Sequence, residues 1–129
     1  QLSGLQRACR DVYVDPSLVQ YAVKLVTATR EPARVGLKEL VPMITFGASP
    51  RATIGLIEGA RALALMRGRP YALPEDMTDL VPDVLRHRLV LTYQALSEEL
   101  TPDAVVARIM AKVPAPPKPL HHEQLVSQA

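Results

Sequence analysis

The chain has 129 residues, with 15 Lys and Arg against 13 Asp and Glu, and a formal net charge of +2. A chain of this length can bury one ordinary hydrophobic core, so we expect one domain. Because the charges nearly balance and 48% of the residues are hydrophobic, the composition excludes a disordered chain and gives no support for binding to nucleic acid or to an anionic membrane.

The sequence carries no pattern typical of membrane insertion or of a disulfide framework. Its longest apolar stretch is far shorter than the ~18 residues of a membrane-spanning helix, so we expect no membrane-spanning segment. Cys9 is the only cysteine, which excludes a disulfide within the chain and agrees with a cytoplasmic location. The chain begins at Gln1 with a helix-like pattern almost at once, so we expect it to be a piece of a longer protein.

Helical patterns separated by proline-marked breaks follow one another, and strand-like alternation is nearly absent. A short helix is predicted over residues 3–10, with Ser3 as its candidate N-cap. The pattern is clearer over 16–30, where Asp15 can cap the helix, Pro16 suits its first position, and apolar residues recur at helical spacing.

The stretch from 31 to 48 is less regular because it contains several prolines and glycines. We expect a loop across the surface there, with a short helical turn at about 37–41. A mostly buried helix is predicted over 52–67, because few of its positions are polar. Gly55 and Gly59 lie four residues apart in this helix, a spacing that allows close packing with a neighbour.

Two further segments follow residue 70. A helix is expected over 74–81, since Glu75 and Asp76 lie in its first turn, where acidic side chains are favoured. After a break at Pro82, residues 84–92 fit either a helical turn or a short extended segment.

The last predicted helix covers 102–113, because Thr101 can cap it and a proline follows. The predicted fold is therefore all-α, a small helical bundle with at most one short extended segment. The helical domain is expected over 1–113, and a proline-rich tail over 114–129 is expected to be extended or disordered.

Few side chains in this sequence suit an enzyme. The sequence lacks a glycine-rich phosphate loop of the G-x-x-x-x-G-K-[ST] type and a dinucleotide-binding fingerprint. Its only histidines are His87, His121 and His122, so we expect no metal site, and the pair His121-His122 would bind metal only adventitiously.

Arg51 is the residue that most needs an explanation. With Ser49 as N-cap and Pro50 at the first helical position, Arg51 lies in the first turn, where the helix dipole disfavours a cation by a few tenths to about 1 kcal/mol. No Asp or Glu occurs over 47–55 to offset this cost. Because a guanidinium beside uncapped N–H groups suits a phosphate, one hypothesis is that Arg51 binds an external anion.

The alternative for Arg51 is a salt bridge to a carboxylate elsewhere in the chain, such as Glu39 or Glu58. The residues alone leave the two hypotheses equally open. Glu58 and Arg61 lie on nearly the same side of the predicted helix as Arg51 and form one polar stripe with it. This stripe faces either a cleft or solvent.

The basic run Arg86-His87-Arg88 is the second candidate site. One interpretation is the solvated or ion-paired edge of a segment. The other is a contact with a neighbouring domain or an acidic partner, where Arg side chains are favoured. We expect no binding of nucleic acid, because the chain has one Phe and no Trp and therefore lacks an aromatic stacking surface.

Several motifs occur in an order that resembles one family. The sequence Gly47-Ala48-Ser49-Pro50-Arg51-Ala52 is followed by an apolar helix ending in Ala60-Arg61-Ala62-Leu63-Ala64, then by Gly68-Arg69, Pro74-Glu75-Asp76 and Val84-Leu85-Arg86-His87-Arg88-Leu89. Over residues 5–114 the chain resembles the C-terminal lid domain of MoxR-type AAA+ ATPases. The resemblance implies an all-helical lid that packs beside a nucleotide-binding α/β domain, which precedes the lid and is missing from this sequence.

The resemblance also implies roles for particular residues. In such ATPases the arginine of the GASPR motif is the sensor 2 residue, which reaches the nucleotide phosphates, so this role falls on Arg51, with Ser49 and Pro50 beside it. Residues 86–88 would contribute to an interdomain or intersubunit surface. The stretch 31–46 is longer than a minimal lid connection and is expected to mark a subgroup.

For the full-length parent, the resemblance implies ATP and Mg²⁺ as cofactors, with none bound and no ATP hydrolysed by this fragment alone. It also implies ring-shaped oligomers, often hexameric, and chaperone-like work, commonly with von Willebrand factor A-domain partners. A second hypothesis is a stand-alone helical adaptor that binds a protein partner through the basic run and the proline-rich tail, independently of nucleotide.

Overall fold

A computed structural model of the chain describes residues 11–116. Two further predictions, the helix over 3–10 and the tail beyond residue 116, lie outside the described residues, so the division into domain and tail stays a prediction. The elements in chain order are α2 (Pro16–Arg30), the 3-10 helices η1 (Pro32–Val35) and η2 (Lys38–Met43), β1 (Ile44–Phe46), α3 (Arg51–Met66), α4 (Pro74–Thr78), α5 (Val81–Arg86), β2 (Val90–Leu91), α6 (Tyr93–Ser97) and α7 (Pro102–Lys112).

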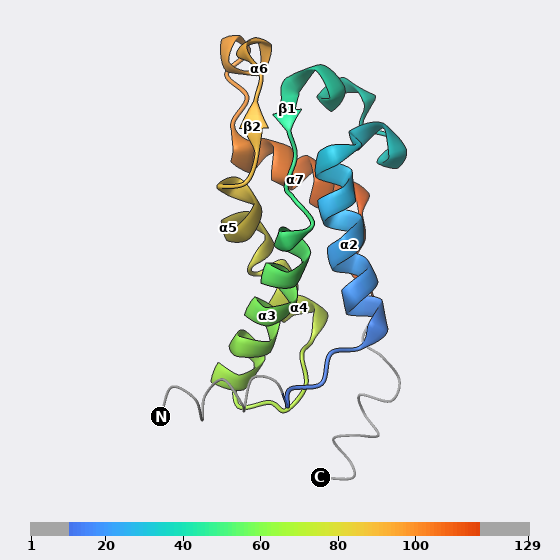
Figure 1. Cartoon of the computed structure of the whole chain (residues 1–129), viewed down its shortest axis with the longest axis vertical. Coiled ribbons are helices and arrows are strands. Elements are labelled where there is room, and N and C mark those ends of the chain that lie inside the picture. The colour runs from blue at the N-terminus through green and yellow to red at the C-terminus, as the bar shows by residue number, and fades with distance from the viewer. Residues whose placement is uncertain (1–10, 117–129) are drawn as a thin grey trace.

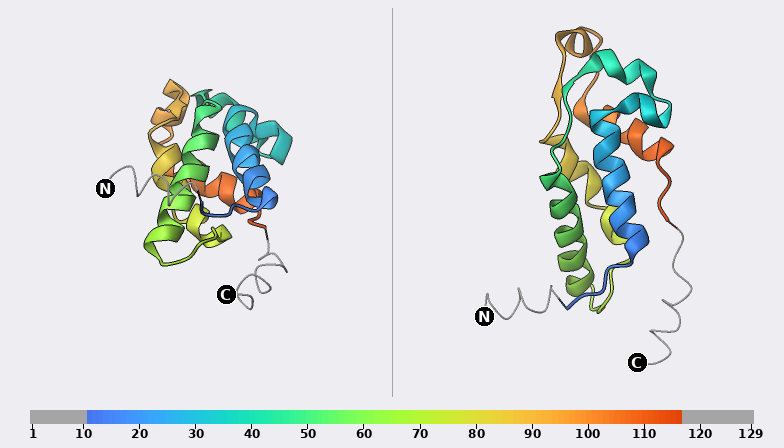
Figure 2. Two further views of the ribbon diagram at one scale, coloured as in Figure 1. Left: turned by 60° about the horizontal axis from the view of Figure 1, so that its bottom comes forward. Right: turned by 45° about the vertical axis from the view of Figure 1, so that its right-hand side comes forward.

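The helices form an elongated bundle (Figure 1). Helices α2 and α3 lie side by side, and α2 also packs against α7, which crosses behind it. The two strands and α6 lie together at one end of the bundle, as the second view of Figure 2 also shows. One core of buried side chains joins the helices, with members such as Leu25, Leu56, Leu85 and Ile109 that are fully inaccessible to solvent. The predicted all-α class is confirmed, and the extended structure consists of one small two-stranded sheet.

Side-chain caps define where two of the helices begin. The Asp15 carboxylate accepts a hydrogen bond of 2.9 Å from the Ser17 N–H at the start of α2. The Thr101 hydroxyl accepts one of 3.1 Å from the Ala104 N–H at the start of α7. Each cap satisfies a backbone donor that has no partner within its helix. Both predicted caps are confirmed.

The stretch from 31 to 48 is more ordered than the expected loop. It contains η1, η2 and β1, of which η2 contains most of the predicted turn at 37–41. Leu37 and Leu40 are buried in the core, so the segment covers the end of the bundle. The prediction of an irregular surface loop was wrong because prolines and glycines break α-helices but are compatible with 3-10 turns, which buried leucines then hold in place.

The ambiguous segment over 84–92 divides into a helical end and a strand. Helix α5 begins before Pro82, at Val81, so the predicted break there was wrong, since proline is accommodated in the first turn of a helix. The preceding helix α4 accordingly ends at Thr78 rather than at residue 81. Strand β2 then pairs antiparallel with β1, through Ile44 opposite Leu91 and Phe46 opposite Val90. Helix α6, which begins at a Thr92 cap, was not predicted.

Helix α3 is less buried than predicted. Ile54 is 62% exposed and Met66 is 82% exposed. Gly59 fits the predicted close packing, because a Cβ there would lie 2.9 Å from Leu80 Cδ1, whereas Gly55 meets nothing nearer than Arg88 Nη2, at 4.0 Å. The buried side of α3 is a narrow stripe in which every fourth residue is buried, namely Ala52, Leu56, Ala60 and Ala64.

The segment before α3 is tied to the end of α2. The Thr29 hydroxyl, which is buried, donates to the Val26 carbonyl at 2.6 Å and accepts from the Ala48 N–H at 2.9 Å. A Cβ on Gly47 would lie 2.4 Å from the Thr29 carbonyl oxygen, so only glycine allows this approach. These contacts set where α3 begins, and therefore where Arg51 lies.

The other end of α3 is tied to α4 through a buried carboxylate. Asp76 is 0% exposed and accepts hydrogen bonds from both Arg69 terminal nitrogens at 2.6 and 2.7 Å, from Arg67 at 2.9 Å and from the Leu73 N–H at 2.7 Å. Arg67 also bonds Asp79 at 2.8 Å. The α3–α4 turn is thus closed by two cations on one carboxylate.

The pKa of Asp76 reflects a balance of two effects. Burial alone raises the pKa, but the hydrogen bonds from Arg69, the Leu73 N–H and Arg67 outweigh burial, so the pKa lies below its ordinary value. The ionised form is therefore the one that the folded state stabilises.

The contact at Gly47 predicts opposite effects for two glycine substitutions. Gly47→Ala should lower the free energy of unfolding by about 2 kcal/mol or more, because the new methyl group meets backbone atoms that cannot yield. Gly55→Ala should leave it unchanged or raise it by up to about 1 kcal/mol, through helix propensity. Urea unfolding followed by circular dichroism measures both values, and equal effects would contradict the close approach at Gly47.

The Asp76 network predicts a large cost for losing its charge. Asp76→Asn should lower the free energy of unfolding by about 3 kcal/mol, because the partly buried guanidinium of Arg69 loses its anionic partner and the exposed Arg67 loses one of its two. The matched control Asp79→Asn, at an exposed carboxylate, should cost less than about 1 kcal/mol. Thermal and urea unfolding of both variants test this difference, and a similar cost for the two would show that burial of Asp76 contributes little.

The lowered pKa of Asp76 predicts an acid-sensitive part of the stability. This contribution is fully present above the unfolded-state pKa of about 4 and is lost as the pH falls through the lower folded-state pKa. The free energy of unfolding should therefore fall more steeply below pH 4 in the parent chain than in Asp76→Asn. If the free energy of unfolding of the two proteins changes equally with pH from pH 2 to 7, Asp76 does not contribute to the acid sensitivity.

Candidate functional site

Arg51 is the first residue of α3 and is exposed. The first turn of α3 contains no acidic side chain, and within residues 11–116 no carboxylate forms an ion pair with Arg51. Glu58, one of the two partners considered for it, instead lies 3.5 Å from Arg61. The salt-bridge alternative is therefore wrong for the part of the chain that the structure describes, and the Arg51 guanidinium faces solvent.

Ser49 and Pro50 do not act as the sequence suggested. Helix α3 begins at Arg51, with Pro50 in the N-cap position and no side-chain cap. The predictions of Ser49 as N-cap and of Pro50 as the first helical residue were therefore wrong. The Ala52 N–H donates instead to the Ser49 carbonyl at 2.9 Å, and the Thr53 N–H to the Pro50 carbonyl at 3.1 Å. Since 3-10-type bonds use these two donors, an anion here would be held by the Arg51 guanidinium and the helix dipole.

Arg86 is engaged inside the domain. Its Nε donates to Asp103 Oδ1 at 2.6 Å, which joins α5 to α7. Its Nη1 lies 3.2 Å from Oδ1 of Asp83, within α5. The hydrogen bond to Asp103 raises the pKa of Arg86 above its ordinary value. For Arg86 the ion-paired interpretation of the basic run is therefore confirmed, while His87 and Arg88 are exposed.

The fold places the side chain of Arg88, which follows α5, beside the first turns of α3. Arg88 Nη2 lies 4.0 Å from the Cβ position of Gly55, and Gly55 follows Arg51 by one helical turn. Within the described residues, neither guanidinium has an acidic partner. Sequence reasoning missed this neighbourhood, because the only signal was a glycine four residues after an arginine.

The remaining members of the predicted polar stripe neutralise each other in part. Arg61 pairs with Glu58, and the buried Nε of Arg61 has no hydrogen-bond partner in the described part of the chain. Arg51 therefore differs from Arg61, because the only carboxylate of α3, Glu58, pairs with Arg61.

Arginine chemistry limits what this site can do. A guanidinium donates hydrogen bonds and stabilises negative charge, but it stays protonated and so transfers no proton.

Residues 11–116 contain no group of three His, Cys, Asp or Glu side chains that could hold a metal ion. They also contain no helix long and apolar enough to cross a membrane. Cys9, His121 and His122 lie outside the described residues.

Comparisons with known proteins identify the fold. A family model described as the AAA lid domain matches residues 40–109. A solved structure from Cytophaga hutchinsonii, described as that of an inferred ATPase, is similar with a TM-score of 0.83 at 37% identity, over 86% of this chain and 34% of that chain.

Two sequence relatives agree with this match. Chaperone MoxR1 of Mycobacterium tuberculosis is 47% identical over 115 residues, which cover 89% of this chain and 30% of that protein. Protein MoxR of Paracoccus denitrificans is 33% identical over 122 residues, covering 89% of this chain and 36% of that protein. The chain thus spans about a third of the length of the curated relatives it matches. It belongs to the AAA lid domain family and is the lid domain of a MoxR-type AAA+ protein.

Proposed function

We propose that this lid senses nucleotide in a longer ATP-hydrolysing protein, with Arg51 as its sensor 2 residue. The observation that carries the proposal is an exposed arginine, without an acidic partner in the described chain, at the N-terminus of α3. The helix dipole opposes a cation at this position by up to about 1 kcal/mol, so a compensating anion outside the lid is expected. The terminal phosphate of ATP supplies such an anion, and a guanidinium can bind it through two hydrogen bonds.

The remaining chemistry belongs to a nucleotide-binding domain outside this chain. That domain would supply the phosphate loop, the ATP site and the Mg²⁺ ligands, and the lid alone would bind and hydrolyse no ATP. Arg51 would stabilise charge on the transferred phosphate. The exposed side chains of Ile54 and Met66 on α3 suit burial against such a domain.

The lid also suits a mechanical role. Helix α3 is tied to α2 through Thr29 and to α4 through Asp76, so the lid would turn as one body when Arg51 binds the phosphate. Such a rotation would couple nucleotide state to the geometry of a ring, in which Arg88 and His87 contact a neighbouring domain or subunit. Chaperone-like work in the cytoplasm, with von Willebrand factor A-domain partners, completes this proposal.

The decisive variant is Arg51→Ala in the full-length protein that contains this chain. We expect kcat for ATP hydrolysis to fall about 100-fold, because one charge-assisted contact to the phosphate is lost. Nucleotide affinity should fall by no more than about tenfold, since most ground-state contacts belong to the other domain. Arg51→Lys should restore only part of the rate, because the ammonium lacks the planar fork.

Arg108→Ala is the matched control, since Arg108 is also an exposed arginine, on α7. It should leave both kcat and nucleotide affinity within about twofold of the parent values, because no phosphate contact is removed. If Arg51→Ala behaves like Arg108→Ala, Arg51 does not sense nucleotide, and a nucleotide-independent adaptor becomes the better explanation.

A further inference from the structure

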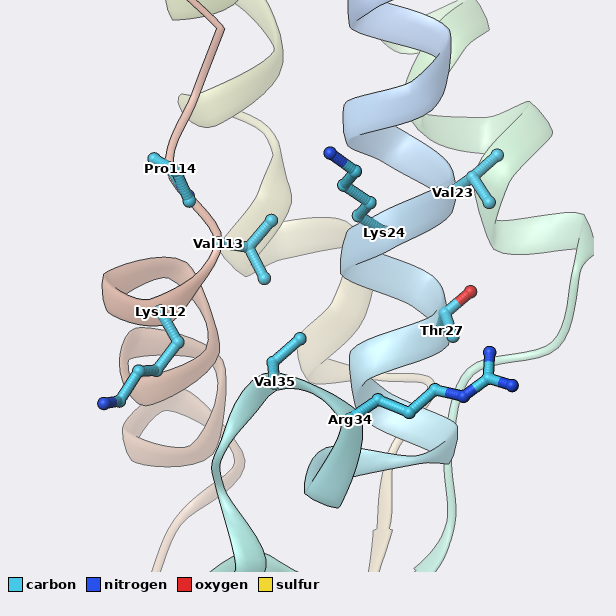
Figure 3. A pocket seen from close by; sticks show the side chains of 8 residues that line it. All are labelled: Val23, Lys24, Thr27, Arg34, Val35, Lys112, Val113 and Pro114. Atoms are coloured by element: carbon cyan, nitrogen blue, oxygen red, sulfur yellow. The ribbon is translucent and has the colours of Figure 1, made fainter.

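A groove runs along α2, on the side where this helix meets η1 and the end of α7. Its largest part is a cavity of about 450 Å³, and the valines that line it are Val23, Val35 and Val113. In Figure 3 the side chains of Val35, at the end of η1, and Val113, after α7, point toward each other. Val23 projects from the other side of α2 and is 46% exposed, so it is accessible to a ligand that lies along the helix.

Two smaller cavities extend this groove along the helix. One, of about 180 Å³, shares Lys24 and Pro114 with the main cavity and continues toward Ser17. The other, of about 300 Å³, shares Thr27 and continues toward Glu31. From Ser17 to Glu31 the helix rises about 20 Å, which is the length of a short peptide segment.

The rim of the groove is cationic. Lys24, Arg30, Arg34 and Lys112 line the three cavities, and among the described residues the one carboxylate that lines them is that of Glu31. That carboxylate already pairs with Arg34 at 2.8 Å. Within residues 11–116 the other three cations have no acidic partner. The groove therefore carries more cations than carboxylates, although the formal net charge of the whole chain is only +2.

We propose that this groove binds an acidic, amphipathic peptide segment of a partner protein. Apolar side chains of the segment would contact Val23 and Val35, and its carboxylates would pair with Lys24, Arg30 and Lys112. Tyr21 also lines the groove but is only 3% exposed, so it offers little surface on which a base could stack, and this disfavours nucleic acid. The groove is built from α2, η1 and α7, whereas Arg51 and Arg88 lie at α3, so the proposal is independent of nucleotide sensing.

A fluorescein-labelled twelve-residue peptide of Glu and Leu tests the proposal by fluorescence anisotropy with the 129-residue chain. It should bind at least about tenfold more tightly than matched peptides with Lys in place of Glu or Ser in place of Leu. Binding should weaken as salt increases from low to physiological concentration, because exposed charges are screened. Equal binding of the three peptides, or tighter binding of a single-stranded RNA, would overturn the proposal.

Exposed charge reversals locate the binding site. Lys24→Glu combined with Lys112→Glu should weaken binding of the Glu/Leu peptide at least about tenfold, and Val23→Ser should weaken it without changing the salt dependence. The matched control Lys38→Glu changes an exposed cation on η2 that does not line the groove, and should change affinity by less than about twofold. A loss of affinity with Lys38→Glu as large as with the Lys24 and Lys112 reversals would overturn the assignment.

Other occupants of the groove give distinct results. Self-association of the chain that is abolished by Lys24→Glu would show that a second copy fills the groove. Loss of peptide binding in the full-length protein would show that another domain of that protein fills the groove. Either result overturns the partner proposal. Arg51→Ala should leave peptide affinity unchanged. The peptide assay therefore tests the groove independently of the proposal that Arg51 senses nucleotide.

Discussion

The hydrogen bonds to the buried carboxylate of Asp76 hold together the end of the bundle at which α3 is followed by α4. A charge that is fully withdrawn from solvent is tolerable only when every acceptor is used, and here two arginines and one backbone N–H use them. The turn between α3 and α4 also holds the segment before α2, because the Tyr13 N–H donates to the Pro70 carbonyl and the Tyr13 carbonyl accepts from the Ala72 N–H. Hydrogen bonds therefore connect the end of α3 with the start of α4 and with the segment that precedes α2.

Helix α3 is held at both ends by contacts of different kinds. At its start, Thr29 of α2 bonds the Ala48 N–H, and the absence of a side chain on Gly47 lets the two backbones approach. At its other end the attachment is ionic, through Asp76. A helix restrained at both ends transmits a force at Arg51 to the rest of the lid with little internal adjustment, which suits a sensor of bound nucleotide.

Single positions in the candidate site were predictable to different degrees. Arg51 could be found from its place in the first turn and from the lack of nearby carboxylates in the sequence, because helix electrostatics is local. The Ser49 cap was predicted wrongly, since serine, proline and helix patterning cannot distinguish a side-chain cap from a 3-10 first turn. The position of Arg88 near the helix of Arg51 and the ion pair between Arg86 and Asp103 were not predictable, because they are contacts between elements far apart in sequence.

The sequence by itself determined the all-α class, the starts of α2 and α7 and the family motifs, because caps, proline positions and helical periodicity act over a few residues. Tertiary structure decided the path of residues 31–48 and the pairing of β1 with β2, since a short strand is defined only by its partner. It also decided which side of α3 is buried and how the groove along α2 forms. These features depend on packing between elements, and no local pattern encodes which distant side chains a helix will meet.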